Sequence, residues 1–90
     1  MKLIAWLLAW LFATSIVGTA SWGDFGGHIV TRYPAGTPVM VCGRSCVAGR
    51  SWGYGPTRAT GRIVDLDRRL FEEVCGPTSL GLCRVTLRTP

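Results

Sequence analysis

Four cysteines constrain this chain more than any other feature: Cys42, Cys46, Cys75 and Cys83. An even number of cysteines in a small chain that leaves the cytoplasm indicates disulfides, because thiols oxidise and stay oxidised there. Zinc is the alternative. The spacings C-x3-C and C-x7-C lack the paired C-x2-C knuckles of common zinc sites, however, and the single histidine, His28, is distant in the sequence. The sequence therefore predicts a disulfide-stapled domain that holds no metal and no other cofactor.

The N-terminal segment has the layout of a secretory signal peptide. A basic Met1-Lys2 start precedes Leu3 to Ala13, which carries no polar side chain, and Gly18-Thr19-Ala20 places small residues at the −3 and −1 positions of a cleavage site. An uncleaved membrane anchor is the alternative, because Leu3 to Ala20 would form about 27 Å of helix against a hydrocarbon core of about 30 Å. We expect cleavage after Ala20, with residues 1–20 as the signal peptide and residues 21–90 as a domain that is secreted or held in the cell envelope. Membrane contact is expected only if the segment is retained.

The chain that remains after cleavage is short and mildly basic. Removal of Lys2 leaves nine arginines against five carboxylates, which lowers the formal net charge from +5 to +4. So short a domain cannot hold a large nucleotide-binding fold, and the apolar content, 48% of the whole chain, argues against disorder. A modest positive charge suits a polyanionic neighbour such as a bacterial wall, whereas export separates the protein from most nucleic acid. We expect a monomer that binds no nucleic acid.

Glycines and prolines divide the chain into short pieces, which is typical of strands joined by turns. The strands expected from the residue pattern are 28–33, 38–42, 46–50, 61–66 and 82–88. One helix is expected over residues 68–75, with Asp67 as its cap and Gly76 as its end. These features together favour a small, all-β domain with one short helix.

The cysteine pairs follow from the expected strands. A three-residue hairpin loop at 43–45 places Cys42 opposite Cys46, within reach of a disulfide. We therefore predict the pairs Cys42–Cys46 and Cys75–Cys83. The long-range pairs Cys42–Cys83 and Cys46–Cys75 would each gain more from loop closure, but entropy alone does not choose between the two pairings.

Three segments, in this order, carry a family resemblance: Tyr33 to Val41 resembles an "LP-x-GT-x-V-x-V" segment, Gly53-Tyr54-Gly55-Pro56 the end of an "ND-x-GP" loop, and Gly61 to Asp67 a "GRIIDLS" segment. The family is the rare lipoprotein A-like double-psi β-barrel, related to expansins and to barrel-type lytic transglycosylases. The resemblance covers roughly residues 20–88. It implies a six-stranded barrel with one short helix that binds or acts on peptidoglycan or another wall polysaccharide.

The resemblance also locates a departure in the catalytic loop. The family's catalytic Asp falls at Gly53, which has no proton to give. An active lytic transglycosylase or glycan hydrolase would need another carboxyl group, and Asp65 and Asp24 are the candidates, with His28 as a partner in acid–base chemistry. The structural alternative for Asp65 is that it accepts backbone amides near the start of the helix. The binding function is favoured over turnover.

Aromatic residues in glycine-rich loops support glycan binding, because sugar rings stack their C–H faces on aromatic rings and arginines bind hydroxyls or carboxylates. The expected glycan-binding residues are Trp22, Trp52, Tyr54 and Arg58. The alternative for Trp22 is that it closes one end of the barrel, and Tyr33 and Phe71 are expected in the core. A third possibility for the whole protein is a small secreted effector that binds another protein.

Overall fold

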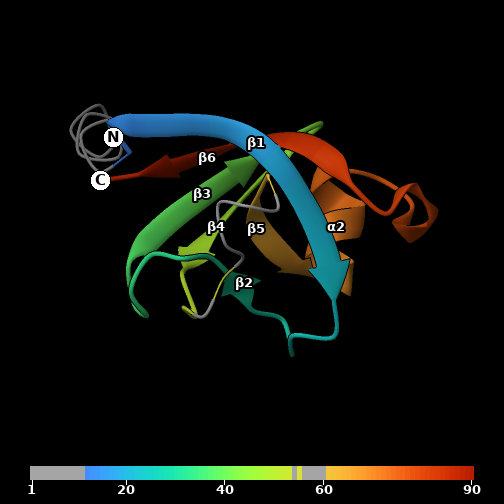
Figure 1. Cartoon of the computed structure of the whole chain (residues 1–90), viewed down its shortest axis with the longest axis horizontal. Helices are drawn as coiled ribbons and strands as arrows, with labels where there is room; N and C mark the ends of the chain where they lie inside the picture. The colour runs from blue at the N-terminus through green and yellow to red at the C-terminus, as the bar shows by residue number, and fades with distance from the viewer. Residues whose placement is uncertain (1–11, 54, 56–60) are drawn as a thin grey trace, which may run out of the picture.

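A computed structural model describes residues 12–53, 55 and 61–90. The described elements are β1 (Thr14–Gly23), β2 (Ile29–Val30), β3 (Pro38–Cys42), β4 (Cys46–Arg50), β5 (Arg62–Asp67), helix α2 (Arg68–Val74), the short 3-10 helix η2 (Thr78–Leu80) and β6 (Cys83–Thr89). Figure 1 shows these strands wrapped around one interior, with α2 packed beside β5. The expectation of short strands and one α-helix is confirmed for the described residues.

The six strands form one sheet in the order β2-β5-β1-β6-β3-β4. The pairing of β1 with β5 is parallel, and every other pairing of neighbouring strands is antiparallel. The two ends of this order approach each other through an isolated parallel bridge between Ile29 and Ser51. The sheet is therefore a nearly closed barrel, and closure leaves few free strand edges.

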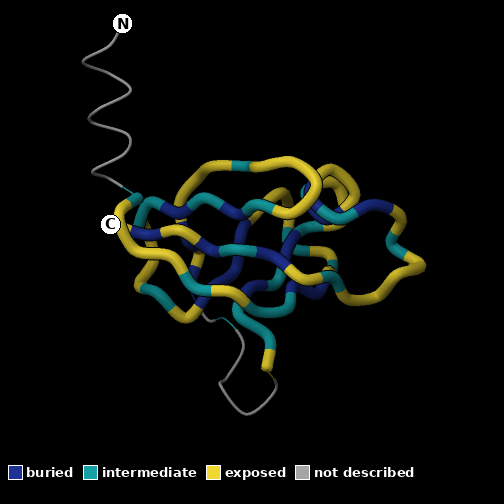
Figure 2. The backbone as a smooth tube through the Cα atoms, turned by 90° about the horizontal axis from the view of Figure 1, so that it is seen from above, coloured by how far each residue is buried: buried dark blue, intermediate teal, exposed yellow. Residues whose placement is uncertain are grey.

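The core comes from one face of each long strand, as the alternation of side chains along a strand requires. Along β3 and β6 buried and more exposed residues alternate. Figure 2 shows the buried residues gathered in the interior, with exposed residues on the turns and along the outer strands. The hydrophobic core cluster consists of Ala20, Ile29, Val39, Val41, Val64, Leu66, Phe71, Val74, Val85 and Leu87. Phe71 is buried as expected, and Tyr33 packs against the core from a partly buried position.

The two disulfides are Cys42–Cys46 and Cys75–Cys83, which confirms the predicted pairing. Both meet at the C-terminal end of α2. Cys75 caps the helix, and the hairpin closed by Cys42–Cys46 reaches it through Arg44, whose guanidinium donates to the Glu72 carbonyl at 2.7 Å. Cationic donors at the carbonyl end of a helix satisfy orphan acceptors and complement its dipole.

Two expected boundaries differ from the structure by more than one residue. The strand expected at 28–33 has only two residues, because the Thr31 hydroxyl accepts the Tyr33 amide at 3.0 Å and turns the chain out of the sheet. At the other end, the predicted signal-peptide boundary after Ala20 falls inside β1. The part of the predicted leader before residue 12 lies outside the described residues. No helix in the described ranges is long and apolar enough to cross a membrane.

Candidate functional site

One outer face of the barrel, where β2, β5 and β1 lie side by side, carries several of the predicted site residues. Val30 pairs with Asp65, and Asp65 pairs with Ser21. Because Leu66 points into the core, strand alternation turns Asp65 away from it, and Ser21, which pairs with Asp65, lies on the same side. We call this surface the β2–β5–β1 face.

Asp65 is held within this face by two donors. The Ser21 hydroxyl donates to Asp65 Oδ1, and Arg62 lies 3.4 Å from the same oxygen and 3.1 Å from Ser21 Oγ. The Asp65 side chain is only 14% exposed. Asp65 thus links β5 to β1 as a hydrogen-bond acceptor, and among the described residues it accepts none of the backbone amides expected of it.

That amide-binding role belongs to Asp67, two residues later. Asp67 stands at the N-cap of α2, where its carboxylate lies near the first helix amides without forming a cap hydrogen bond, and it accepts the Phe25 amide at 3.0 Å. The backbone amide of Gly27, and then those of Phe25, Arg69 and Arg68, lower the pKa of Asp67 below 3.8, although partial desolvation raises it. The carboxylate therefore fastens the loop after β1 to the start of the helix.

The lowered pKa of Asp67 makes a pH-dependent contribution to stability. A group whose pKa is depressed in the folded state stabilises the fold above its unfolded pKa, and the contribution disappears as the pH falls through the folded pKa. We expect Asp67→Asn to be less stable than the parent protein at pH 7 and to approach it below pH 3.8. Thermal unfolding between pH 7 and pH 2.5 checks this, with Glu73→Gln on the exposed side of α2 as the control. An equal stability difference at all pH values would contradict it.

The aromatic part of the site is a stack of His28 on Trp52. The ring centroids are 4.5 Å apart and the planes are within 6° of parallel. Both side chains are exposed, Trp52 by 48%. The backbone sets this contact, because the Trp52 amide donates to the Ile29 carbonyl at 2.8 Å. Within the described ranges, His28 thus has an aromatic partner and not the carboxylate partner that acid–base chemistry would need.

A buried hydroxyl pair fixes the loop that carries Trp52. Thr31 Oγ1 and Ser51 Oγ are 2.6 Å apart, and Ser51 Oγ also donates to the Tyr33 carbonyl and accepts the Gly53 amide. Gly53 is buried with φ of 82°, a backbone conformation that favours glycine. Gly53, where the family resemblance places a catalytic Asp, is therefore a glycine in a turn, and the buried Ser51 hydroxyl fixes that turn by accepting the Gly53 amide.

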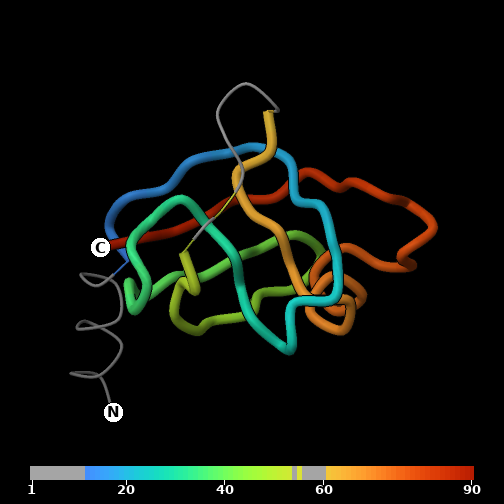
Figure 3. The backbone as a smooth tube through the Cα atoms, turned by 60° about the horizontal axis from the view of Figure 1, so that its bottom comes forward, coloured from blue at the N-terminus to red at the C-terminus, as the bar shows by residue number. Residues whose placement is uncertain are grey.

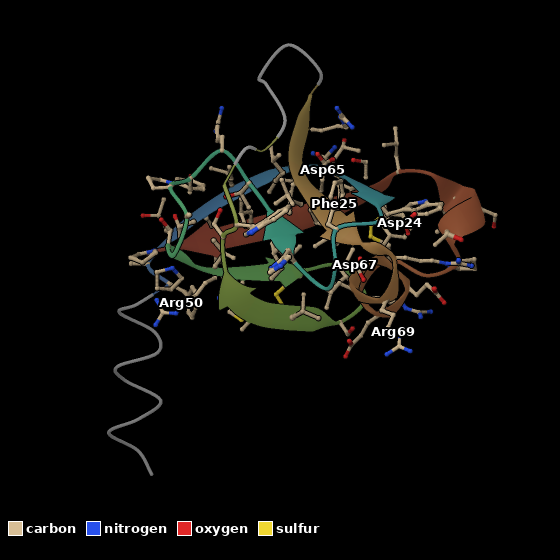
Figure 4. The ribbon with its side chains drawn as sticks, turned by 90° about the horizontal axis from the view of Figure 1, so that it is seen from below. Asp24, Phe25, Arg50, Asp65, Asp67 and Arg69 are labelled. Carbon is tan, nitrogen blue, oxygen red and sulfur yellow. A yellow bond between two sulfur atoms is a disulfide. The ribbon has the colours of Figure 1, made fainter. Side chains whose placement is uncertain are left out.

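The remaining candidates do not all gather here. Figure 4 shows Asp24, Phe25, Asp65 and Asp67 near the end of β1, and Asp24 is exposed. The Phe25 ring covers Gly23, where a Cβ would come within 2.9 Å of it.

Trp22 is 36% exposed, but its indole N–H donates to the Thr78 carbonyl at 2.9 Å, which ties it to η2. Tyr54 and Arg58 lie outside the described residues. The described part of the chain contains no group of His, Cys, Asp or Glu that could hold a metal ion.

Sequence comparisons find no match to a family model or to a curated protein. Among solved structures, the chain is similar to an Asp-to-Asn variant of an expansin from Clavibacter michiganensis in complex with cellohexaose. The TM-score is 0.68 at 15% sequence identity, over 86% of this chain and 50% of that chain, so this chain spans half of the expansin's length. The similarity confirms the expected fold class, a small double-psi β-barrel.

Proposed function

We propose that this protein binds a polysaccharide of the cell envelope, in the first instance the glycan strands of peptidoglycan, and that the His28–Trp52 stack is the centre of its binding surface. The observation that carries the proposal is the exposed pair of stacked rings at the surface of the nearly closed barrel. The expansin of similar fold was crystallised with a cellulose oligosaccharide, which supports a carbohydrate ligand. Disulfides support a location outside the cytoplasm.

The stack suits a sugar because it is exposed yet ordered. His28 on one side of Trp52 limits its rotation, so little side-chain entropy is lost when a sugar covers the other side. Covering the exposed half of an indole removes about 100 Å² of apolar surface from water, which corresponds to about 2.5 kcal/mol. That free energy is large enough to carry most of the affinity for one sugar ring.

Binding without turnover is favoured by the state of the carboxylates. A general acid must bring a proton to the glycosidic oxygen, but both partners of Asp65 donate hydrogen bonds to it, so it is used as an acceptor. Asp24 is exposed to solvent, and Gly53 has no side chain. An active glycan-cleaving enzyme would have to release Asp65 from these hydrogen bonds or draw Asp24 from solvent toward the substrate.

The test is sedimentation of the protein with purified, insoluble peptidoglycan. Trp52→Ala is expected to weaken binding more than tenfold, because it removes the stacking surface and leaves the core untouched. Leu80→Ala is the matched control: Leu80 is also a large exposed side chain, 55% exposed, but lies on η2. Both variants are expected to keep the unfolding temperature of the parent protein within about 3 °C.

Other outcomes separate the alternatives. Unchanged binding by Trp52→Ala would contradict the proposed surface, and parallel sedimentation with cellulose and chitin identifies the preferred glycan. Soluble anhydro-muropeptides that appear with the parent protein and vanish with Asp65→Asn would establish the lytic transglycosylase. Absence of saturable binding to every glycan would favour the protein-binding effector.

A further inference from the structure

Strand β1 occupies the centre of the barrel sheet. In the order β2-β5-β1-β6-β3-β4 it is the strand that joins β5 on one side to β6 on the other. Apart from the isolated Ile29–Ser51 bridge, no other strand pairing of the described residues connects these two halves. The sheet therefore depends on β1 for its continuity.

The part of β1 that lies before the predicted cleavage position carries the whole pairing ladder with β6. The antiparallel register begins with Thr14 opposite Thr89 and ends with Ala20 opposite Cys83. Figure 3 shows the start of β1 beside the C-terminal end of β6. Removal of residues 1–20 would delete every β1 residue in this ladder and would leave only Ser21 to Gly23 paired with β5. The two halves of the sheet would then lose the strand between them.

Side-chain packing agrees with the backbone pairing. Ala20 is completely buried in the core, and Ile16 packs against it. Gly18 lies so close to Ile63 that a Cβ at this position would come within 2.6 Å of the Ile63 side chain. The neighbouring Val17 faces out and is 57% exposed. Ile16 and Gly18 pair with the buried Leu87 and Val85 of β6, and Ala20 pairs with Cys83, so these alternate residues of β1 lie on the side that faces the core.

We propose that Thr14–Ala20 is part of the folded domain, and that signal-peptide processing, where it takes place, cuts before Thr14. The small-residue motif Gly18-Thr19-Ala20 is then explained by packing: Gly18 lies against the Ile63 side chain, and Ala20 fills a fully buried core position. The proposal moves the processing position into residues 1–13. It does not depend on what the barrel binds.

The first test is the mass of the exported protein, expressed from the full chain. A product whose N-terminus lies anywhere from residue 1 to residue 14 supports the proposal, whether it is recovered from the membrane or the soluble fraction. A folded product that begins at Ser21 overturns it.

The second test uses two neighbouring residues that face opposite sides of β1. In the full chain, Ile16→Asn places an amide against the core, whereas Val17→Asn places it in solvent. If the segment is retained, Ile16→Asn lowers the unfolding temperature of the purified protein by more than about 8 °C, and Val17→Asn by less than about 3 °C. If the segment is removed as a leader, both purified products are identical to the parent and neither temperature moves, which would overturn the proposal.

Discussion

Reduction of both disulfides is expected to lower the unfolding temperature of the barrel by about 20 °C or more. Closing the short loop between Cys42 and Cys46 stabilises the fold by about 2 kcal/mol, and closing the loop between Cys75 and Cys83 by about 2.6 kcal/mol. A domain of this size obtains only about 3–5 kcal/mol from its core. The stabilisation free energy of the two disulfides together is therefore comparable to that of the hydrophobic core.

The location of the disulfides adds to this effect. Cys75–Cys83 joins the C-cap of α2 to the start of β6, and Cys42–Cys46 closes the hairpin whose Arg44 and Ser45 donate to carbonyls of the same helix end. Loss of either cross-link loosens α2, which contributes the buried Phe71 to the core. We therefore expect the effects of the two disulfides to be coupled and not simply additive.

Thermal unfolding of the oxidised protein, the reduced protein and two paired variants measures these contributions. The variants are Cys42→Ser with Cys46→Ser, and Cys75→Ser with Cys83→Ser. The second pair is expected to lose more stability than the first, because its loop is longer. Unfolding of the reduced protein within about 3 °C of the oxidised protein would mean that the core is far stronger than its size indicates.

The sequence was sufficient to predict elements whose signals are local. The Cys42–Cys46 hairpin is encoded by a three-residue turn between two short strands, and the helix by the spacing of Leu70 and Val74 before Gly76. The disulfide pairing followed from these local elements. The family resemblance gave the barrel class, because residues 61–67 match its most distinctive segment.

The start of the barrel and the centre of the site could not be predicted in the same way. The apolar run before Thr14 continues into Ile16 and Val17, so a leader and a buried strand produce one hydrophobic signal. The contact of His28 with Trp52 joins residues that are far apart in the chain, and only the closure of the barrel brings them together. The partners of Asp65 and Asp67 are also distant in the sequence. No local pattern could therefore show that Asp65 accepts a hydrogen bond from Ser21, or that Asp67 accepts the Phe25 amide.

Replacing Gly55 by alanine is expected to disrupt the loop that presents Trp52. A Cβ at Gly55 would come within 2.5 Å of Thr31 Cα and of the Arg32 backbone nitrogen, and backbone atoms cannot swing aside as a side-chain end can. The Gly55 amide also donates to the Thr31 carbonyl at 3.0 Å, so displacement breaks that hydrogen bond. Overpacking costs about 1–3 kcal/mol and a lost hydrogen bond about 1 kcal/mol, which together give about 3 kcal/mol.

Gly53→Ala is the matched control. The two glycines lie in the same loop, but alanine is unfavourable at each for a different physical reason: steric contact at Gly55 and backbone conformation at Gly53. Gly53 has φ of 82°, but a Cβ there would meet nothing closer than the Ala35 backbone nitrogen at 3.6 Å. Its cost is the backbone strain alone, about 1–2 kcal/mol. The unfolding temperature should therefore fall further for Gly55→Ala than for Gly53→Ala. Binding to peptidoglycan in the sedimentation assay should also weaken further, because the buried Thr31–Ser51 hydrogen bond fixes the loop that carries Trp52. Equal unfolding temperatures for the two variants would show that the loop can move away from Thr31, and that its close packing is not what positions Trp52.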